Sequence, residues 1–253
     1  MSDSYIFRFA TIMVVLVAAI LTLVASLLKP MQEDNRRAEK MQEILGAANI
    51  NVSRDSAIHV YQHRLIAEYA ISLQGDITTV YDGSKQEFTK GENRPFEMDM
   101  KRLMNDLERY EKGSLETAPT LPLFIMRDHN DDSLFVFPLR GNGLWGPIWG
   151  NMALKNDLNT VAGASFDHAG ETPGLGAQIN TDQFSEQFEN TRIFDDDGEF
   201  VSIKVVKGGV ENSSIPGDHG VDAISGGTIT SNGVTHMIED GFRYYLPFIK
   251  KYQ

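Results

Sequence analysis

The stretch DAISGGTITSNG, residues 222–233, lies near the C-terminal end of this 253-residue chain. It places Ser and Thr hydroxyls on a Gly-Gly turn directly before an amphipathic helical pattern. Glycine can take positive φ and approach a ligand closely, and a helix N-terminus favours an anion such as phosphate. Ser and Thr are also favoured as ordinary helix caps. The stretch therefore indicates either a phosphate-binding loop or a hydroxyl-rich cap, and both interpretations stay open at this point.

The N-terminal region contains an uncharged apolar run, FATIMVVLVAAILTLVASLL, at residues 9–28. A helix of that length, at about 1.5 Å per residue, spans the roughly 30 Å hydrocarbon core of a bilayer. A cleaved signal peptide is the alternative, but its apolar region is about 7–15 residues long and precedes a small-x-small site, which residues 27–30 lack. We predict a short tail over residues 1–7 and one membrane helix over residues 8–29.

Basic residues flank this run unevenly. Arg8 lies on the short N-terminal side, whereas the other side carries Lys29, Arg36, Arg37 and Lys40. Counted strictly, the positive-inside rule leaves the large domain in the cytoplasm. The difference is small and the tail is short, so the residues alone leave the topology open.

Composition excludes several classes of function. The formal net charge of −12 argues against a nucleic-acid partner, which requires clustered Lys and Arg. The chain has no cysteine, which excludes disulfides, Cys-ligated zinc and Cys-ligated iron–sulfur clusters. Redox chemistry on this chain would therefore need an organic cofactor or a metal without thiolate ligands. No residue is assigned a catalytic or metal-binding role.

The remaining chain predicts an α+β fold with a largely antiparallel sheet flanked by helices. Residues 30–48 form a charged helical stalk rather than a core element, and residues 49–253 form the domain. We expect helices from residue 53 towards 76, at 98–110, at 181–194 and from 231 to Pro247, with loops elsewhere in 80–120. Expected strands lie at residues 121–126, 133–140, 146–155, 160–167 and 199–207.

Residues 141–146, GNGLWG, match the G-x-G-x-x-G pattern. A dinucleotide fingerprint needs a helix directly after it, but Pro147 and a strand-like run follow here. We predict a Gly-rich hairpin instead. It either offers Leu144 and Trp145 to a flat ring or forms an aromatic corner of the core.

Residues 170–176, GETPGLG, form a second Gly-rich turn. Such a turn can present main-chain N–H groups, with the Glu171 and Thr172 side chains, to a ligand. Paired with the loop from Ser225 to Thr228, this turn is predicted to form one half of a pocket for an anion and a ring.

These features together resemble a known family. The N-terminal apolar run, G-L-W-G, E-T-P-G-L-G and D-x-x-S-G-x-T-x-T-S-N-G-V are similar to the C subunit of the Na⁺-translocating NADH:quinone reductase, and more broadly to the FMN-binding domains of that complex and of the Rnf complex. The resemblance covers the apolar run and the C-terminal half, whereas residues 50–120 match only by their place in the order. It implies an FMN-binding domain behind a membrane helix.

The resemblance also implies a covalent cofactor. A flavin transferase joins FMN through a phosphoester to the motif threonine, which corresponds to Thr228, and the family's usual alanine is Gly227 here. Lys207 is expected to offset charge on reduced flavin. The expected cofactor-binding residues are Thr228, Asp222, Ser225, Gly226, Gly227, Ile229 and Thr230, with Leu144, Trp145, Glu171, Thr172, Leu175, Gly176 and Lys207 near the flavin.

As the resemblance implies, the domain lies on the periplasmic side of the bacterial cytoplasmic membrane, against the weak charge count. Its partners are the membrane, the transferase and the other subunits of a six-subunit redox pump. It would pass single electrons from an iron–sulfur centre to a second covalent FMN. Three alternatives stay open: an Rnf-type FMN subunit, a free-standing flavinylated carrier, and a membrane-anchored binding domain without redox chemistry.

Overall fold

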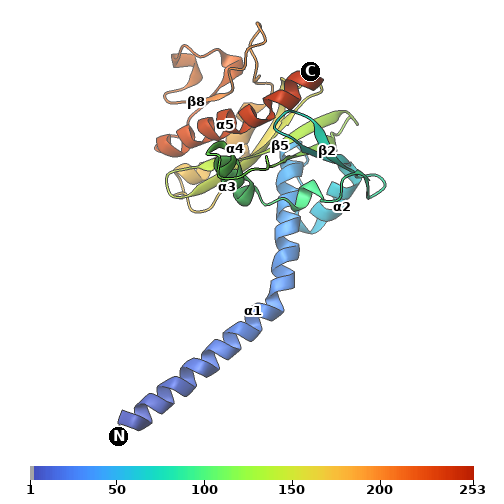
Figure 1. The fold of residues 1–253 in the computed structure, drawn as a ribbon. Helices are drawn as coiled ribbons and strands as arrows, with labels where there is room; N and C mark the ends of the chain where they lie inside the picture. Colours follow the sequence, from blue (N-terminus) through green and yellow to red (C-terminus); the bar gives the residue numbers. More distant parts are fainter. Residues whose placement is uncertain (1–2) are drawn as a thin grey trace.

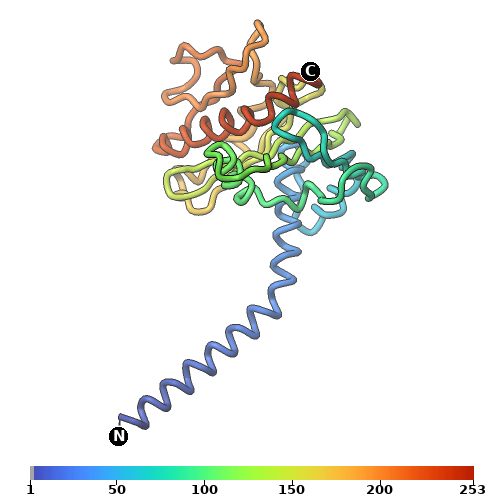
Figure 2. Tube along the Cα trace, viewed as in Figure 1, coloured from blue at the N-terminus to red at the C-terminus, as the bar shows by residue number. Residues whose placement is uncertain are grey.

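The computed structural model describes residues 3–253. One long helix, α1 (Asp3–Ala47), leads into a domain built on an antiparallel sheet (Figure 1). The tube in Figure 2 shows the N-terminal part of α1 standing free of the domain, while its last turns enter it. The other helices are α2 (Arg54–Arg64), α3 (Met100–Glu111), α4 (Asp182–Ser185) and α5 (Thr228–Tyr252).

Helix α1 joins the predicted membrane span to the predicted stalk without interruption. Pro30 lies inside the helix, and Figure 1 shows α1 bent part-way along its length, as proline in a helix causes. The N-terminal part is long and apolar enough to cross a membrane. The expectation of a stalk outside the core is wrong for the last turns, because Met41, Ile44 and Leu45 are buried. The boundaries of tail, span and stalk stay predictions.

The main sheet has seven strands in the order β3-β2-β1-β4-β5-β6-β7, and all neighbours are antiparallel. This arrangement confirms the α+β prediction. The strands are β1 (Leu65–Ile71), β2 (Ile77–Asp82), β3 (Glu87–Lys90), β4 (Leu121–Arg127), β5 (Ser133–Asn142), β6 (Pro147–Leu154) and β7 (Val161–His168). A separate parallel pair, β8 (Lys204–Val206) and β9 (Gly220–Asp222), precedes α5.

Two hydrophobic cores cover the two faces of the sheet. On one face α5 packs through Phe242 and Tyr245 against Phe137, with the Phe137 and Tyr245 rings 5.0 Å apart. On the other face the end of α1 and α2 surround Phe124. The Ser165 hydroxyl on β7 also donates a 2.8 Å hydrogen bond to the Glu43 carbonyl of α1. The sheet is therefore held between α5 and the junction with α1.

Helix α5 begins at Thr228 and continues past Pro247 to Tyr252, whereas a helix from 231 that ends at Pro247 was expected. Four other secondary-structure expectations were also wrong in part. The helix expected from residue 53 towards 76 ends at Arg64, and strand β1 follows it directly. Most residues of β1 are buried, so its sequence lacks the alternation of apolar and polar residues that marks a strand. The end of β2 and all of β3 lie in residues 80–120, where loops were expected, although α3 is close to its predicted position.

Two residues in the left-handed region account for the other two differences. Asn190, at φ 62°, follows the short helix α4 and the 3₁₀ turn Glu186–Phe188, where one longer helix was expected. Ser202, at φ 61°, interrupts the expected strand over 199–207, so that only β8 forms. Phe184, Phe188 and Phe194, which lie in the first of these segments, are buried.

Candidate functional site

The loop before α5 is a tight turn. The Gly227 N–H donates to the Ile224 carbonyl at 2.9 Å, and Gly226 takes a φ of 76°, which a side chain would oppose. The Ser231 hydroxyl accepts from the Ile224 N–H at 3.2 Å, and the Ser231 N–H donates to the Gly227 carbonyl. The turn therefore leads directly into the first residue of α5, Thr228.

The hydroxyls in this turn differ in exposure and bonding. Thr230 and Ser231 are buried, and Thr230 donates to Glu171 Oε2 at 2.6 Å. Thr228 is half-buried, and within residues 3–253 its hydroxyl makes no hydrogen bond. In the same part of the chain the N–H groups of Thr228, Ile229 and Thr230 also have no partner, as is usual in a first helical turn without a side-chain cap. One hydroxyl and three N–H donors are thus available at one helix end.

Two further loops approach this helix end. In the loop after β7, the Leu175 N–H donates to the Thr172 carbonyl at 3.0 Å, with Pro173 and Gly174 at the corners. At the other loop, β5 and β6 form a hairpin closed by a 2.8 Å bond from the Gly143 N–H to the Gly146 carbonyl. No helix follows this hairpin, which confirms the prediction against a dinucleotide fingerprint.

Glu171 joins these loops. Its Oε1 accepts from the Trp145 N–H at 2.8 Å, and its Oε2 accepts from the Thr230 hydroxyl. Glu171 is only 5% exposed, so its carboxylate is enclosed by these segments. Its contact with a ligand stays a prediction. The Glu171 N–H donates to His168 Nδ1 at 3.2 Å.

A small cavity of about 240 Å³ lies where the three segments meet. Ten of the fourteen predicted cofactor-binding residues line it: Leu144, Glu171, Thr172, Leu175, Gly176, Gly226, Gly227, Thr228, Ile229 and Thr230. Leu144, Leu175 and Ile229 are more than two-fifths exposed there, an unusual exposure for large apolar side chains in a folded domain. Segments that are far apart in sequence therefore form one polar and apolar site.

The other four predicted residues lie outside this cavity. The Trp145 side chain is 68% exposed. Asp222 and Ser225 line a neighbouring hollow, and Asp222 Oδ1 accepts from the Val210 N–H at 2.8 Å, which fastens the loop after β8. Lys207 is exposed directly after β8. Their roles towards a cofactor stay predictions.

His168 was not predicted as part of the site. Its Nε2 is buried and has no hydrogen-bond partner within residues 3–253, although its Nδ1 accepts from Glu171. Nothing in the sequence marks it beyond its position three residues before Glu171.

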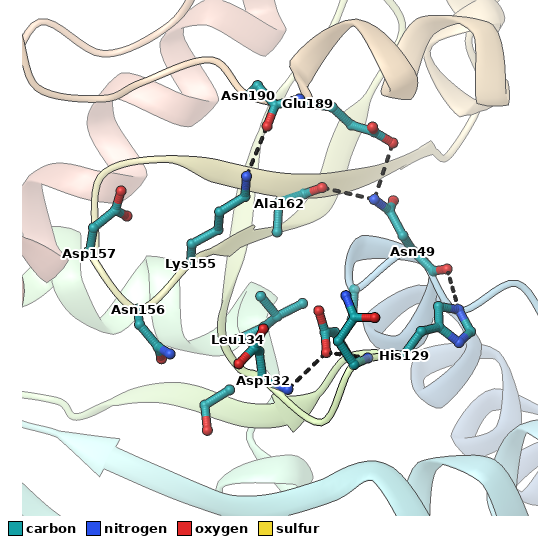
Figure 3. A pocket seen from close by; sticks show the side chains of 14 residues that line it. Asn49, His129, Asp132, Leu134, Lys155, Asn156, Asp157, Ala162, Glu189 and Asn190 are labelled. Atoms are coloured by element: carbon teal, nitrogen blue, oxygen red, sulfur yellow. Dashed lines mark hydrogen bonds between the residues drawn. The ribbon is translucent and has the colours of Figure 1, made fainter.

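A larger polar hollow, of about 640 Å³, contains none of the predicted residues (Figure 3). Asn49 donates there to the Ala162 carbonyl and to Glu189, and Lys155 donates to Asn190. These bonds fasten the end of α1 and two loops to one another, so the hollow is interpreted as a structural junction.

The segment around the small cavity is similar to known proteins. A model of the FMN-binding domain matches residues 143–243, a range that includes every residue lining the small cavity. The C subunit of the Na(+)-translocating NADH-quinone reductase from Pseudomonas aeruginosa is 30% identical, over 96% of this chain and 97% of that protein. The chain belongs to the family of these C subunits. Its relatives are therefore parts of an oxidoreductase complex.

Two further relatives agree. The corresponding subunit from Vibrio anguillarum is 31% identical, over 96% of this chain and 92% of that protein. The crystal structure of the corresponding subunit from Parabacteroides distasonis superposes with a TM-score of 0.71 at 33% identity, covering 88% of this chain and 96% of that one. Both support the family assignment over most of the chain, including residues 50–120, where the motifs gave no match.

Proposed function

We propose that this chain is the membrane-anchored, electron-carrying C subunit of a Na⁺-translocating NADH:quinone reductase, with FMN joined by a phosphoester to Thr228. The observation that carries the proposal is the difference between the hydroxyls of one turn. Thr230 is bonded to Glu171 and Ser231 to the Ile224 N–H. Thr228, at the head of α5, is half-buried, and its hydroxyl has no hydrogen bond within the part of the chain that the structure describes.

The residues of the small cavity fit FMN. The free N–H groups of Thr228, Ile229 and Thr230 can receive phosphate oxygens, and the N-terminal end of a long helix favours their negative charge. Leu144 and Leu175 stand exposed at the same cavity and can cover an apolar ring. FMN supplies the reversible uptake of electrons when bound, and the protein positions it and adjusts its environment.

The attachment requires little catalytic machinery in this chain. The Thr228 oxygen gives its proton to the base and bonds to the flavin-side phosphorus of a flavin dinucleotide. The bond from that phosphorus to the bridging oxygen breaks and the nucleoside monophosphate leaves; a flavin transferase supplies the dinucleotide, the metal and the base. The chain only has to present a pliable loop. Gly226 and Gly227 provide that loop, and the turn leaves the Thr228 side chain half-exposed.

The rest of the proposal concerns the location of the domain. The apolar part of α1 anchors the chain in the cytoplasmic membrane, with the domain on the periplasmic side, where the transferase acts. The other subunits of the pump deliver electrons from an iron–sulfur centre and receive them on a second FMN. No NADH, quinone or Na⁺ site is assigned to this chain.

The test is coexpression of the full-length chain with its flavin transferase. We expect the intact mass to rise by one FMN phosphoester, with flavin fluorescence that survives a denaturing gel. Thr228→Val should lose both signals, because it removes the acceptor oxygen. Ser114→Ala, which removes an exposed hydroxyl outside the lining of the small cavity, should keep them.

An unmodified wild-type mass would contradict the proposal. It would favour the alternative in which these hydroxyls only cap a helix. If the Thr228→Val variant still carried FMN, the attachment site would be another residue.

A further inference from the structure

Among the described residues that line the small cavity, only Glu171 has side-chain hydrogen bonds to two other segments. Oε1 accepts from the Trp145 N–H in the β5–β6 turn at 2.8 Å, and Oε2 accepts from the Thr230 hydroxyl in α5 at 2.6 Å. These partners lie 26 and 59 positions away in the sequence. We infer that Glu171 is a positioning residue, whose buried carboxylate fastens the walls of the flavin cavity and places a fixed negative charge beside it. The inference rests on the proposed function, since it assumes FMN in this cavity.

Two glycines leave room for this carboxylate. A Cβ atom at Gly143 would lie 2.5 Å from Oε1, and one at Gly176 would lie 2.5 Å from Oε2 and 2.4 Å from Thr230 Oγ1. Contacts that short do not occur for real side chains, so any larger residue at either position would displace the carboxylate. The β5–β6 turn and the loop after β7 are therefore both shaped around Glu171.

The backbone of Glu171 is fixed as well. Its N–H donates to His168 Nδ1 at 3.2 Å at the end of β7. With its own backbone tied to the sheet and its carboxylate tied to the hairpin and to α5, Glu171 links three elements. The two observed hydrogen bonds of the carboxylate go to the walls of the cavity, so we expect Glu171 to act on FMN through these walls and through its charge.

The Glu171 carboxylate is not part of an ion pair. Within residues 3–253 no Lys, Arg or His forms an ion pair with Glu171, and the side chain is 5% exposed. Charges interact strongly over short distances where water is excluded. A carboxylate that lines the cavity therefore opposes the addition of an electron to a cofactor there, and it should make the midpoint potential of that cofactor more negative.

The test compares three full-length variants. Glu171→Gln keeps an acceptor for the Trp145 N–H and can donate to the Thr230 oxygen, but it removes the charge. Glu171→Ala removes both links. Glu87→Gln is the matched control, because Glu87 is exposed on β3, the edge strand farthest in sheet order from β7.

We expect Glu171→Gln to load FMN as the wild type does and to shift the midpoint potential to more positive values, while Glu87→Gln leaves it unchanged. We expect Glu171→Ala to lose loading. Its Trp145 amide should also exchange with deuterium about tenfold faster in the protein without FMN, since a lost hydrogen bond of ordinary strength corresponds to such a factor.

A Gln variant with the wild-type potential would overturn the electrostatic part. An alanine variant with full loading and unchanged amide exchange would overturn the positioning part. If the alanine variant does not fold, Gly176→Ala tests the positioning part instead, because it keeps Glu171 but displaces its carboxylate. A Gly176→Ala protein whose Trp145 amide exchanges at the wild-type rate would also overturn the inference. If the wild type takes up no FMN, the proposed function fails, and the amide exchange still decides whether Glu171 fastens the hairpin.

Discussion

At the scale of single residues, the first turn of α5 distinguishes neighbouring hydroxyls by their partners. Thr230 donates to a buried carboxylate and Ser231 accepts from the turn before it, so both stabilise the loop. Within residues 3–253, the Thr228 hydroxyl makes neither kind of hydrogen bond. Under the proposed function, Thr228 is therefore the expected acceptor for FMN, because its hydroxyl has no such bond within the described residues 3–253.

Gly227 stands where the family pattern has alanine, which leads to a prediction. Its φ of −104° suits alanine, and a Cβ would lie 3.0 Å from Ile224 Cγ2, a side-chain contact that a small shift relieves. We expect Gly227→Ala to keep FMN loading and to change the free energy of unfolding by less than about 1 kcal/mol. Denaturant unfolding and in-gel fluorescence measure the two effects.

Gly226→Ala is the contrasting variant. Gly226 has a φ of 76°, and its Cβ would lie 2.7 Å from Leu175 Cδ2, so strain and crowding combine. We expect less loading than in Gly227→Ala. Equal loading in the two variants would mean that the turn does not control attachment.

Sequence patterns predicted most of the residues that meet at the small cavity, because Gly-rich turns with hydroxyl and carboxyl side chains indicate ligand loops in any context. They could not predict that Glu171 turns inward, since that depends on the Trp145 N–H and Thr230 from distant segments. For the same reason His168 had no signal of its own.

At the scale of elements, α1 has two different parts. Its N-terminal part is exposed and apolar, whereas its last turns are packed on the sheet, where Trp149 Nε1 donates to Glu43 Oε1 at 3.1 Å. The sequence predicted the first part because an uncharged apolar run of that length is typical of a membrane helix. It did not predict the packing of the last turns, because the three buried residues Met41, Ile44 and Leu45 are few and lie among charged residues.

The junction at Glu43 predicts a pH dependence. Burial raises the pKa of Glu43 to about 7, helped by Asp167 and Glu39 and opposed by the Trp149 hydrogen bond and Lys40. The folded state then binds more protons than the unfolded state between the ordinary carboxyl pKa of 4.5 and about 7. The free energy of unfolding should therefore fall as the pH rises through that window and stay level above it.

Glu43→Gln should remove this contribution and stabilise the protein above pH 7 by up to about 3 kcal/mol. Urea unfolding of the full chain in detergent, followed by tryptophan fluorescence, measures it. An identical pH profile for the variant and the wild type would show that Glu43 titrates normally.

Two glycines in helices provide a matched pair for packing. A Cβ at Gly233 in α5 would lie 2.3 Å from the Asn142 carbonyl oxygen, whereas one at Gly46 in α1 would meet only Ser165 Cβ at 3.7 Å. We expect Gly233→Ala to destabilise the domain by about 1–3 kcal/mol and to lower FMN loading, since α5 must move from the hairpin. Gly46→Ala should instead stabilise it by up to about 1 kcal/mol. Thermal unfolding that ranks the two variants in the opposite order would contradict this packing.

At the scale of the whole molecule, an apolar helix leads into a domain whose small cavity is built from the β5–β6 hairpin, the loop after β7 and the head of α5. The antiparallel sheet holds these segments together, although they are far apart in the chain. This arrangement suits a protein that is tied to a membrane complex and exchanges electrons with it.

The absence of native cysteine allows a clean test of the proposed orientation. Ser114, in an exposed loop after α3, and Ser4, near the start of α1, can each be replaced by a single cysteine. We expect a membrane-impermeant thiol reagent to label Ser114→Cys but not Ser4→Cys in intact spheroplasts. Labelling of Ser4→Cys alone would place the domain in the cytoplasm, as the count of basic residues suggests.

The most direct test of the central claim is peptide sequencing by mass spectrometry of the chain matured with its transferase. Trypsin releases residues 208–243 as one peptide, because no Lys or Arg lies between Lys207 and Arg243. That peptide contains every candidate hydroxyl of the α5 turn. We predict a single FMN on Thr228 in the fragment series; an unmodified peptide, or FMN on Ser225 or Thr230, would contradict the claim.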